Sequence, residues 1–164
     1  MSVSLTTSYL YTFGYEGLDI ATFIARLIRA GVRTIIDVRK LPLSRKKGFS
    51  KNALREQLAA ADIGYFHAPP LGCPKEIRDR YRENGDWKEY TRDFMLHLRD
   101  QDSTVRELAK ISRSTTACLI CFEADYTMCH RSYVARAAYR VGAPCVKHLT
   151  AKTEFLDQTL RAAA

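Results

Sequence analysis

The chain has 164 residues, which suffices for one domain with a substantial hydrophobic core. The apolar runs are too short for a membrane-spanning helix, and the N-terminal sequence lacks the pattern of a signal peptide. The five cysteines are irregularly spaced, which argues against a disulfide framework. We therefore expect a cytoplasmic protein with reduced thiols and no membrane association. Lys and Arg number 26 against 18 Asp and Glu, so the net charge of +8 favours anionic partners, although a solvated basic surface would also explain it.

Strand and helix patterns alternate along the first part of the chain. Aromatic and β-branched residues predict a strand over 8–13. A helix follows, with Asp19 as its N-cap and Gly31 at its end, and residues 32–38 predict a second buried strand. Short loops join these elements, so the two strands should pair in parallel through a right-handed crossover. The apolar face of the helix consists of Ile20, Phe23, Ile24, Leu27 and Ile28.

A loop over 39–49 leads to a helix that Ser50 can cap and that Gly64 ends. Residues 65–67 are a short strand candidate. The segment 68–86 is long, polar and rich in Pro and Gly, with a short helix possible over 75–83. Such a segment is either a binding loop beside the strand ends or an ordered surface excursion.

The second part of the chain continues the alternation. The pattern predicts a helix from Trp87 to Leu98, a helix capped by Ser103, and a buried strand over 117–121. The pattern then predicts a helix from Cys129 to Gly142, a strand over 145–149 and a terminal helix over 153–161. The sequence therefore predicts a single α/β domain over 1–164, with a mostly parallel sheet flanked by helices.

Reactive side chains follow several of the predicted strands. In a parallel sheet the carboxyl ends of the strands share one rim, where open α/β proteins place their sites. The residues that this topology brings to the rim are Gly14, Tyr15, Arg39, His67, Cys121 and Glu123, together with Cys129, His130 and Arg131 at the start of the following helix.

An anion site is the leading interpretation of this rim. Six cations and no acid lie between Arg39 and Lys51, and guanidinium groups bind phosphate bidentately. The helix start near Cys129 adds free backbone N–H groups, with Arg131 and Ser132 as further donors. The alternative is a solvated basic loop, with Arg131 paired to Glu123.

Three further interpretations concern the same residues. Cys129, at a helix start beside His130, has the setting of a nucleophilic thiol, whereas free cysteines such as Cys121 are often buried hydrophobes. Glu123 is either a general base or nucleophile, or the partner of an arginine. A zinc site is the third interpretation, with ligand types present in Cys121, Cys129, His130 and either His67 or Glu123. Their spacing matches neither a C-x-x-C pair nor a helical H-x-x-x-H set, so we assign no metal and no cofactor. The remaining cysteines, which we expect to be structural, are Cys73, Cys118 and Cys145.

The motifs at 12–17, 37–45, 71–72, 121–123 and 129–132 resemble the family catalogued as domain of unknown function number 488. The resemblance covers nearly the whole chain and implies an intracellular α/β domain with no established activity. Its signature positions correspond here to Gly14, Tyr15, Asp37, Arg39, Pro42, Ser44, Arg45, Cys121, Glu123, Cys129, His130 and Arg131.

A weaker resemblance to rhodanese-type sulfurtransferases rests on the Asp-Val-Arg strand end at 37–39 and on a cysteine in a strand-to-helix loop. That resemblance makes Cys121 a sulfur carrier. Phe122, Glu123 and Asp125 stand where those enzymes have small and basic loop residues.

We therefore predict a protein that binds a phosphate-bearing ligand, a nucleotide or nucleic acid, at the rim, and the sequence leaves open whether it is an enzyme. The alternatives are a thiol-dependent enzyme that uses Cys121 and Cys129 and a non-catalytic module that binds polyanions. The predicted ligand-binding residues are Gly14, Tyr15, Arg39, Ser44, Arg45, Arg131 and Ser132. The predicted catalytic residues are Cys121, Glu123, Cys129 and His130.

Overall fold

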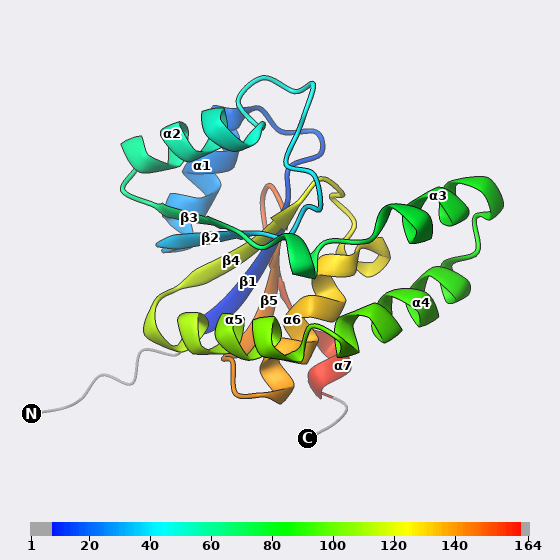
Figure 1. Ribbon diagram of the computed structural model, residues 1–164. Helices are drawn as coiled ribbons and strands as arrows, with labels where there is room; N and C mark the ends of the chain where they lie inside the picture. Colours follow the sequence, from blue (N-terminus) through cyan, green and yellow to red (C-terminus); the bar gives the residue numbers. More distant parts are fainter. Residues whose placement is uncertain (1–7, 162–164) are drawn as a thin grey trace, which may run out of the picture.

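A central β-sheet organises the computed structural model, which describes residues 8–161 (Figure 1). Within these residues the sheet has six strands in the order β3-β2-β4-β1-β5-β6. The first five strands are parallel to their neighbours, and β6 is antiparallel to β5. The strands are β1 (Tyr9–Gly14), β2 (Thr34–Asp37), β3 (Gly64–His67), β4 (Ala117–Cys121), β5 (Cys145–Leu149) and β6 (Glu154–Leu156). The predicted single α/β domain is thereby confirmed. The predicted direct pairing of β1 with β2 is wrong, because β4 lies between them and pairs in parallel with both.

Helices cover both faces of the sheet. One face packs against α1 (Ile20–Arg29) and α2 (Lys51–Ala60), and the other against α4 (Trp87–Arg99), α5 (Asp102–Ser114) and α6 (His130–Arg140). Helix α3 (Lys75–Asn84) lies beside α4 and projects beyond the sheet with it (Figure 1). The remaining elements are the short helix α7 (Gln158–Arg161) and the 3-10 turns η1 (Pro69–Leu71) and η2 (Tyr126–Met128). In the described part of the chain, helices lack the combined length and apolarity needed to cross a membrane.

Two apolar clusters, one on each side of the sheet, hold the layers together. Phe23 and Leu27 of α1 are fully buried on one side, and Phe94 of α4 and Val134 of α6 on the other. Burial of each such side chain contributes about 1.5–3 kcal/mol. Because the helices cover the faces and not the strand ends, the carboxyl rim stays free to carry a site.

The predicted helix ends are partly right. Asp19 accepts the Thr22 backbone N–H at 2.7 Å, and Gly31 has the positive φ of 78° expected after a helix. Ser50 precedes α2, but its hydroxyl donates to the Ser44 carbonyl instead of capping the helix. The prediction that Ser103 caps the next helix is wrong, since α5 begins at Asp102.

Two other boundaries differ from prediction. Helix α2 ends at Ala60, because Gly64 already pairs with Thr34 as the first residue of β3. The expected terminal helix over 153–161 is largely replaced by β6, which pairs with β5, and only the last four residues form α7. The segment is too short for its helical periodicity to decide its structure, because pairing with the open edge of β5 provides backbone hydrogen bonds that stabilise a strand instead.

The ends of β1 and β4 stay together beyond the strands. Tyr15 and Glu16 donate their backbone N–H groups to the Cys121 and Phe122 carbonyls at 3.2 and 2.8 Å. This pairing carries the Glu123 carbonyl over Gly14, where a Cβ atom would lie 1.7 Å from the Glu123 oxygen. Gly14 is therefore required by this close backbone approach.

A buried polar network closes the other side of β1. His148 bonds to Thr12 through Nδ1 and to Asp157 through Nε2, each at 2.7 Å, and Arg136 donates to the same carboxylate at 3.0 Å. Burial lowers the pKa of His148, outweighing the carboxylate of Asp157. Burial would raise the pKa of Asp157, but the His148 hydrogen bond and the charge of Arg136 lower it to about 2.

We predict that Gly14→Ala lowers the free energy of unfolding by at least about 2–3 kcal/mol, because the added methyl group meets backbone atoms that cannot turn away. Urea denaturation of the purified variant measures the change. Gly64→Ala is the matched control, since its Cβ would meet nothing closer than 3.7 Å. Equal stability of Gly14→Ala and wild type would contradict the close approach.

We also predict that the free energy of unfolding falls as the pH is lowered from 7 to 5. In that range the unfolded chain protonates histidine near its ordinary pKa of 6.5, whereas buried His148 resists protonation. A second loss follows below about pH 4, where unfolded but not folded Asp157 takes up a proton. His148→Gln should reduce the first loss, because it removes the histidine that burial keeps unprotonated in the folded state. Identical pH profiles for His148→Gln and wild type would disprove this assignment.

Candidate functional site

A cleft of about 850 Å³ opens at the carboxyl rim of the sheet. Its walls are the basic loop after β2, one side of α3 with the start of α4, and the connection between β4 and α6. The predicted site residues that line it are Tyr15, Arg39, Ser44, Arg45, Cys121, Glu123, Cys129 and His130. One cleft thus brings together a large part of the predicted rim.

Three predicted ligand-binding residues do not line this cleft. Gly14 faces a second hollow of about 410 Å³ between the β1 and β5 ends. Ser132 is buried and donates its hydroxyl to the Tyr126 carbonyl at 2.5 Å. Arg131 is 0% exposed and lies behind the cleft floor. The structure therefore places none of these three residues in direct contact with the cleft.

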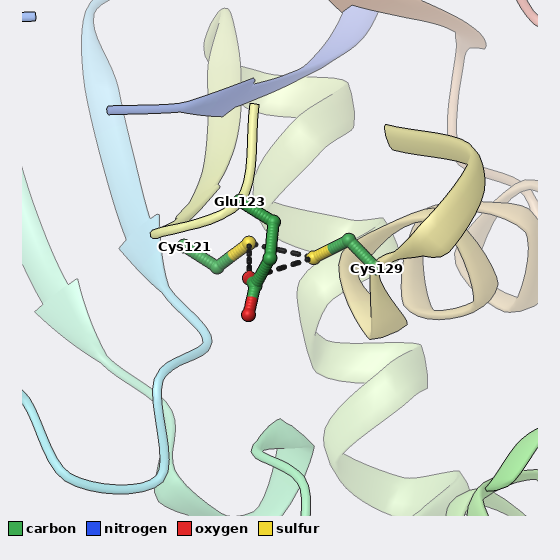
Figure 2. Close-up of side chains that lie close together, drawn as sticks. All are labelled: Cys121, Glu123 and Cys129. Atoms are coloured by element: carbon green, nitrogen blue, oxygen red, sulfur yellow. Dashed lines mark hydrogen bonds between the residues drawn. The ribbon is translucent and has the colours of Figure 1, made fainter. Parts of the chain in front are cut away.

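Two free thiols and one carboxylate converge on the cleft floor (Figure 2). Cys121 ends β4, and Cys129 is the N-cap of α6. Their sulfur atoms are 2.7 Å apart, and Glu123 Oε2 lies 3.2 Å from the first and 3.5 Å from the second. Both cysteines are buried, whereas Glu123 is exposed toward the cleft and points one carboxylate oxygen at the sulfurs.

Arg131 fixes this cluster from behind. Its Nη1 donates to the Glu123 carbonyl at 2.5 Å and to Cys121 Sγ at 3.1 Å, and Nη2 reaches the Ala124 carbonyl at 3.4 Å. Its Nε has no hydrogen-bond partner. None of the described carboxylates forms an ion pair with this guanidinium, so its contacts are the two backbone carbonyls and the Cys121 sulfur.

The cluster perturbs its own ionisation. Burial raises the pKa of Cys121 far above its ordinary value, and the neighbouring Cys129 raises it further, against the effect of Arg131. Burial would also raise the pKa of Glu123, but hydrogen bonds from its own backbone N–H and from the Cys121 thiol lower it overall. At neutral pH the metal-free cluster therefore holds a carboxylate and a protonated Cys121 thiol.

His130 stands beside Cys129 in a defined tautomer. Its Nε2 lies 2.8 Å from the Val38 carbonyl, which only accepts hydrogen bonds, so Nε2 carries the proton. The other ring nitrogen, Nδ1, lies 3.9 Å from Cys129 Sγ. This nitrogen can accept a proton at the cleft floor.

Arg39 is committed to the protein. It binds both carboxylate oxygens of Asp37 at 2.9 and 2.7 Å, and its Nη1 donates to the Tyr15 hydroxyl and the Phe49 carbonyl. Burial would lower the pKa of Arg39, but the bonds to Asp37 raise it above its ordinary value. His67, expected at the same rim, bonds to the Arg39 carbonyl at 2.8 Å and does not line the cleft. Arg39 therefore holds the β2 end in place.

Sequence analysis offered 68–86 as a binding loop or a surface excursion, but it named none of the residues with which α3 and α4 form a wall of the cleft. Arg78, Tyr81 and Arg82 have helical spacing and line one side of the cleft, joined by Trp87 and Tyr90. The i, i+3, i+4 spacing was the available signal, since it places the three α3 residues on one face. That this face turns toward the basic loop is a property of the tertiary structure alone.

The cleft floor allows three kinds of chemistry: proton transfer by Glu123 and His130, dithiol chemistry by the two cysteines, and coordination of a metal ion. Cys121, Glu123 and Cys129 offer donor atoms that all lie within 4.8 Å of one another. The irregular spacing from which we assigned no metal therefore does not keep these ligand types apart.

A family model described as "Domain of unknown function DUF488" matches residues 19–138. None of the curated proteins and none of the solved structures gives a significant match. The matched range includes the basic loop, the α3–α4 wall and the thiol cluster.

We predict that Arg39→Ala lowers the free energy of unfolding by about 3–5 kcal/mol, because it leaves the carboxylate of fully buried Asp37 without its counter-charge. Tyr65, which donates its hydroxyl to Asp37 at 2.5 Å, cannot neutralise that charge. Thermal and urea unfolding provide the measurement. Lys40→Ala is the control, since Lys40 is exposed and has no ion pair among the described residues. Unchanged stability of Arg39→Ala would restore Arg39 as a free ligand-binding residue.

Proposed function

The chain belongs to the DUF488 family, and we propose that its cleft binds a phosphate-bearing aromatic ligand of the nucleotide class. The observation that carries the proposal is the state of Arg78. Among the described residues its guanidinium has no hydrogen-bond or ion-pair partner, and its Nε is buried without an acceptor. A buried N–H without an acceptor costs about 1–3 kcal/mol, and a phosphate oxygen in the cleft would remove that cost.

Further cations face Arg78 from the basic loop. Arg45 and Lys40 line the cleft, and neither forms an ion pair within residues 8–161. Ser44 contributes by shaping the loop: its backbone N–H donates to the Ser50 hydroxyl at 3.0 Å, and its carbonyl accepts from that hydroxyl at 3.1 Å. Because Arg39 is already occupied, we assign phosphate binding to Arg78, Arg45 and Lys40.

Aromatic side chains favour a nucleotide over free phosphate. The rings of Trp87 and Tyr90 stack with centroids 4.5 Å apart, and Tyr81 meets both edge-on at 5.4 Å. All three line the cleft beside Arg78. An aromatic wall next to cations is the combination that binds a base and its phosphate together.

The position of the proposed ligand next to the reactive side chains of the cleft floor supports an enzyme that acts on this ligand. Glu123 and His130 line the same cleft as Arg78 and Arg45. The sulfurtransferase alternative is less well supported, because the Cys121 thiol is 1% exposed and its pKa is raised by burial. A non-catalytic polyanion module would use exposed loop cations such as Lys47 and would have no need of the cleft.

We predict that Arg78→Ala weakens nucleotide binding about tenfold or more, since a charge-assisted hydrogen bond contributes about 1.5–3 kcal/mol. Calorimetric titration with ATP, adenosine, inorganic phosphate and a short oligonucleotide at two salt concentrations provides the measurement. ATP should bind more tightly than adenosine or phosphate if cations and aromatic wall act together.

Arg33→Ala is the matched control. It removes the same charge from an exposed arginine that precedes β2, at the amino ends of the strands and opposite the carboxyl rim. Its effect should be small and should disappear at high salt, because only screened long-range attraction is lost. No binding by wild type at low salt, or equal losses in both variants, would refute the proposed cleft ligand.

A further inference from the structure

We propose that Cys121, Glu123 and Cys129 form a zinc site with one open coordination position on the floor of the cleft. The proposal rests on the geometry and charge of this cluster and is independent of the phosphate-bearing ligand. It requires no residue outside the β4–α6 connection and its supports.

The three donor atoms form a triangle with sides of 2.7, 3.2 and 3.5 Å. Zinc binds sulfur at about 2.3 Å and carboxylate oxygen at about 2.0–2.2 Å, so one point outside the plane of this triangle reaches all three atoms. Tetrahedral coordination then requires the sulfurs to move apart. Two thiolates and a carboxylate are zinc ligands, and three protein ligands with a free fourth position are typical of catalytic sites.

Charge balance favours a dication at this place. Two thiolates and one carboxylate carry three negative charges, which Zn²⁺ and the buried Arg131 guanidinium together neutralise. Without a metal, ionisation of both thiols would leave net negative charge in a buried cluster, which is costly. Binding of Zn²⁺ displaces the two thiol protons to the buffer, no electron is transferred, and the total charge is unchanged.

Arg131 also has the contacts of an outer-shell residue. Its Nη1 hydrogen bonds to Cys121 Sγ and to the Glu123 carbonyl fix two of the three ligands. Such partners orient ligands and tune their basicity. Joining the two sulfurs in a disulfide would need an oxidant, whereas binding of Zn²⁺ needs none.

The test starts from reduced, metal-free, full-length protein titrated with Co²⁺ and with Zn²⁺ alone. We expect one ion per chain, an intense tetrahedral Co²⁺ spectrum with a thiolate charge-transfer band, and displacement of Co²⁺ by Zn²⁺. Calorimetry in buffers of different ionisation enthalpy should show release of about two protons per Zn²⁺.

Cysteine variants identify the ligands. Cys121→Ser and Cys129→Ser should each weaken Zn²⁺ binding by more than about a hundredfold, beyond the usual cost of losing an outer-shell partner. Glu123→Gln should weaken it less, because the amide oxygen remains a donor without the charge. Cys145→Ser is the matched control, since that cysteine is exposed and outside the cluster, and it should bind as wild type does.

Wild-type protein alone gives a second measurement that does not depend on how the variants fold. Bound Zn²⁺ should slow iodoacetamide labelling of Cys121 and Cys129 and leave labelling of Cys145 unchanged, as read by peptide mass spectrometry. A folded wild type that shows neither a thiolate–Co²⁺ spectrum nor this protection would overturn the proposal. Unchanged Zn²⁺ affinity in a folded Cys121→Ser or Cys129→Ser variant would overturn it equally.

Discussion

The path of the Glu123 main chain is the constraint on which the site depends. Gly14 leaves room for the Glu123 carbonyl, and Arg131 holds that oxygen from the other side at 2.5 Å. With the backbone fixed between them, the Glu123 side chain turns back onto Cys121 and Cys129. Gly14 and Arg131 are thus positioning residues: neither lines the large cleft, and both determine what its floor contains.

The arginines of the rim divide into two kinds. Arg39 and Arg131 are almost fully buried and spend their donors on protein atoms, so they give the strand end and the thiol loop their shape. Arg45 and Arg78 lie in the cleft without protein counter-charges among residues 8–161. The first kind contributes rigidity, and the second contributes the positive field that an anionic ligand meets. Arginine side chains therefore both shape the rim and line the cleft.

The two proposals concern different layers of one cleft. In the first proposal, cations and aromatic rings on the walls would bind a phosphate-bearing aromatic ligand. In the second, the sulfur and carboxylate donors on the floor beneath would hold zinc. An open coordination position on the floor would face whatever the walls hold. His130 lies beside that position, with its Nδ1 3.9 Å from Cys129 Sγ.

The sequence by itself determined the alternation of strands and helices along the chain, the Asp19 cap and the rim where the cleft lies, because hydrophobic period and turn residues are local properties. It also brought together eight of the residues that line the cleft, since parallel strand ends must meet. It did not determine the strand order, since the insertion of β4 between β1 and β2 depends on long-range pairing. Only the tertiary structure decided which arginines are free. The reason is that the partner of an arginine depends on burial and on the directions of side chains. Arg39 pairs with Asp37 and Arg131 with the thiol loop, whereas Arg78 has no partner among the described residues. The thiol–carboxylate triangle was hidden for the same reason: residues eight positions apart meet only because a 3-10 turn folds the β4–α6 connection back on itself.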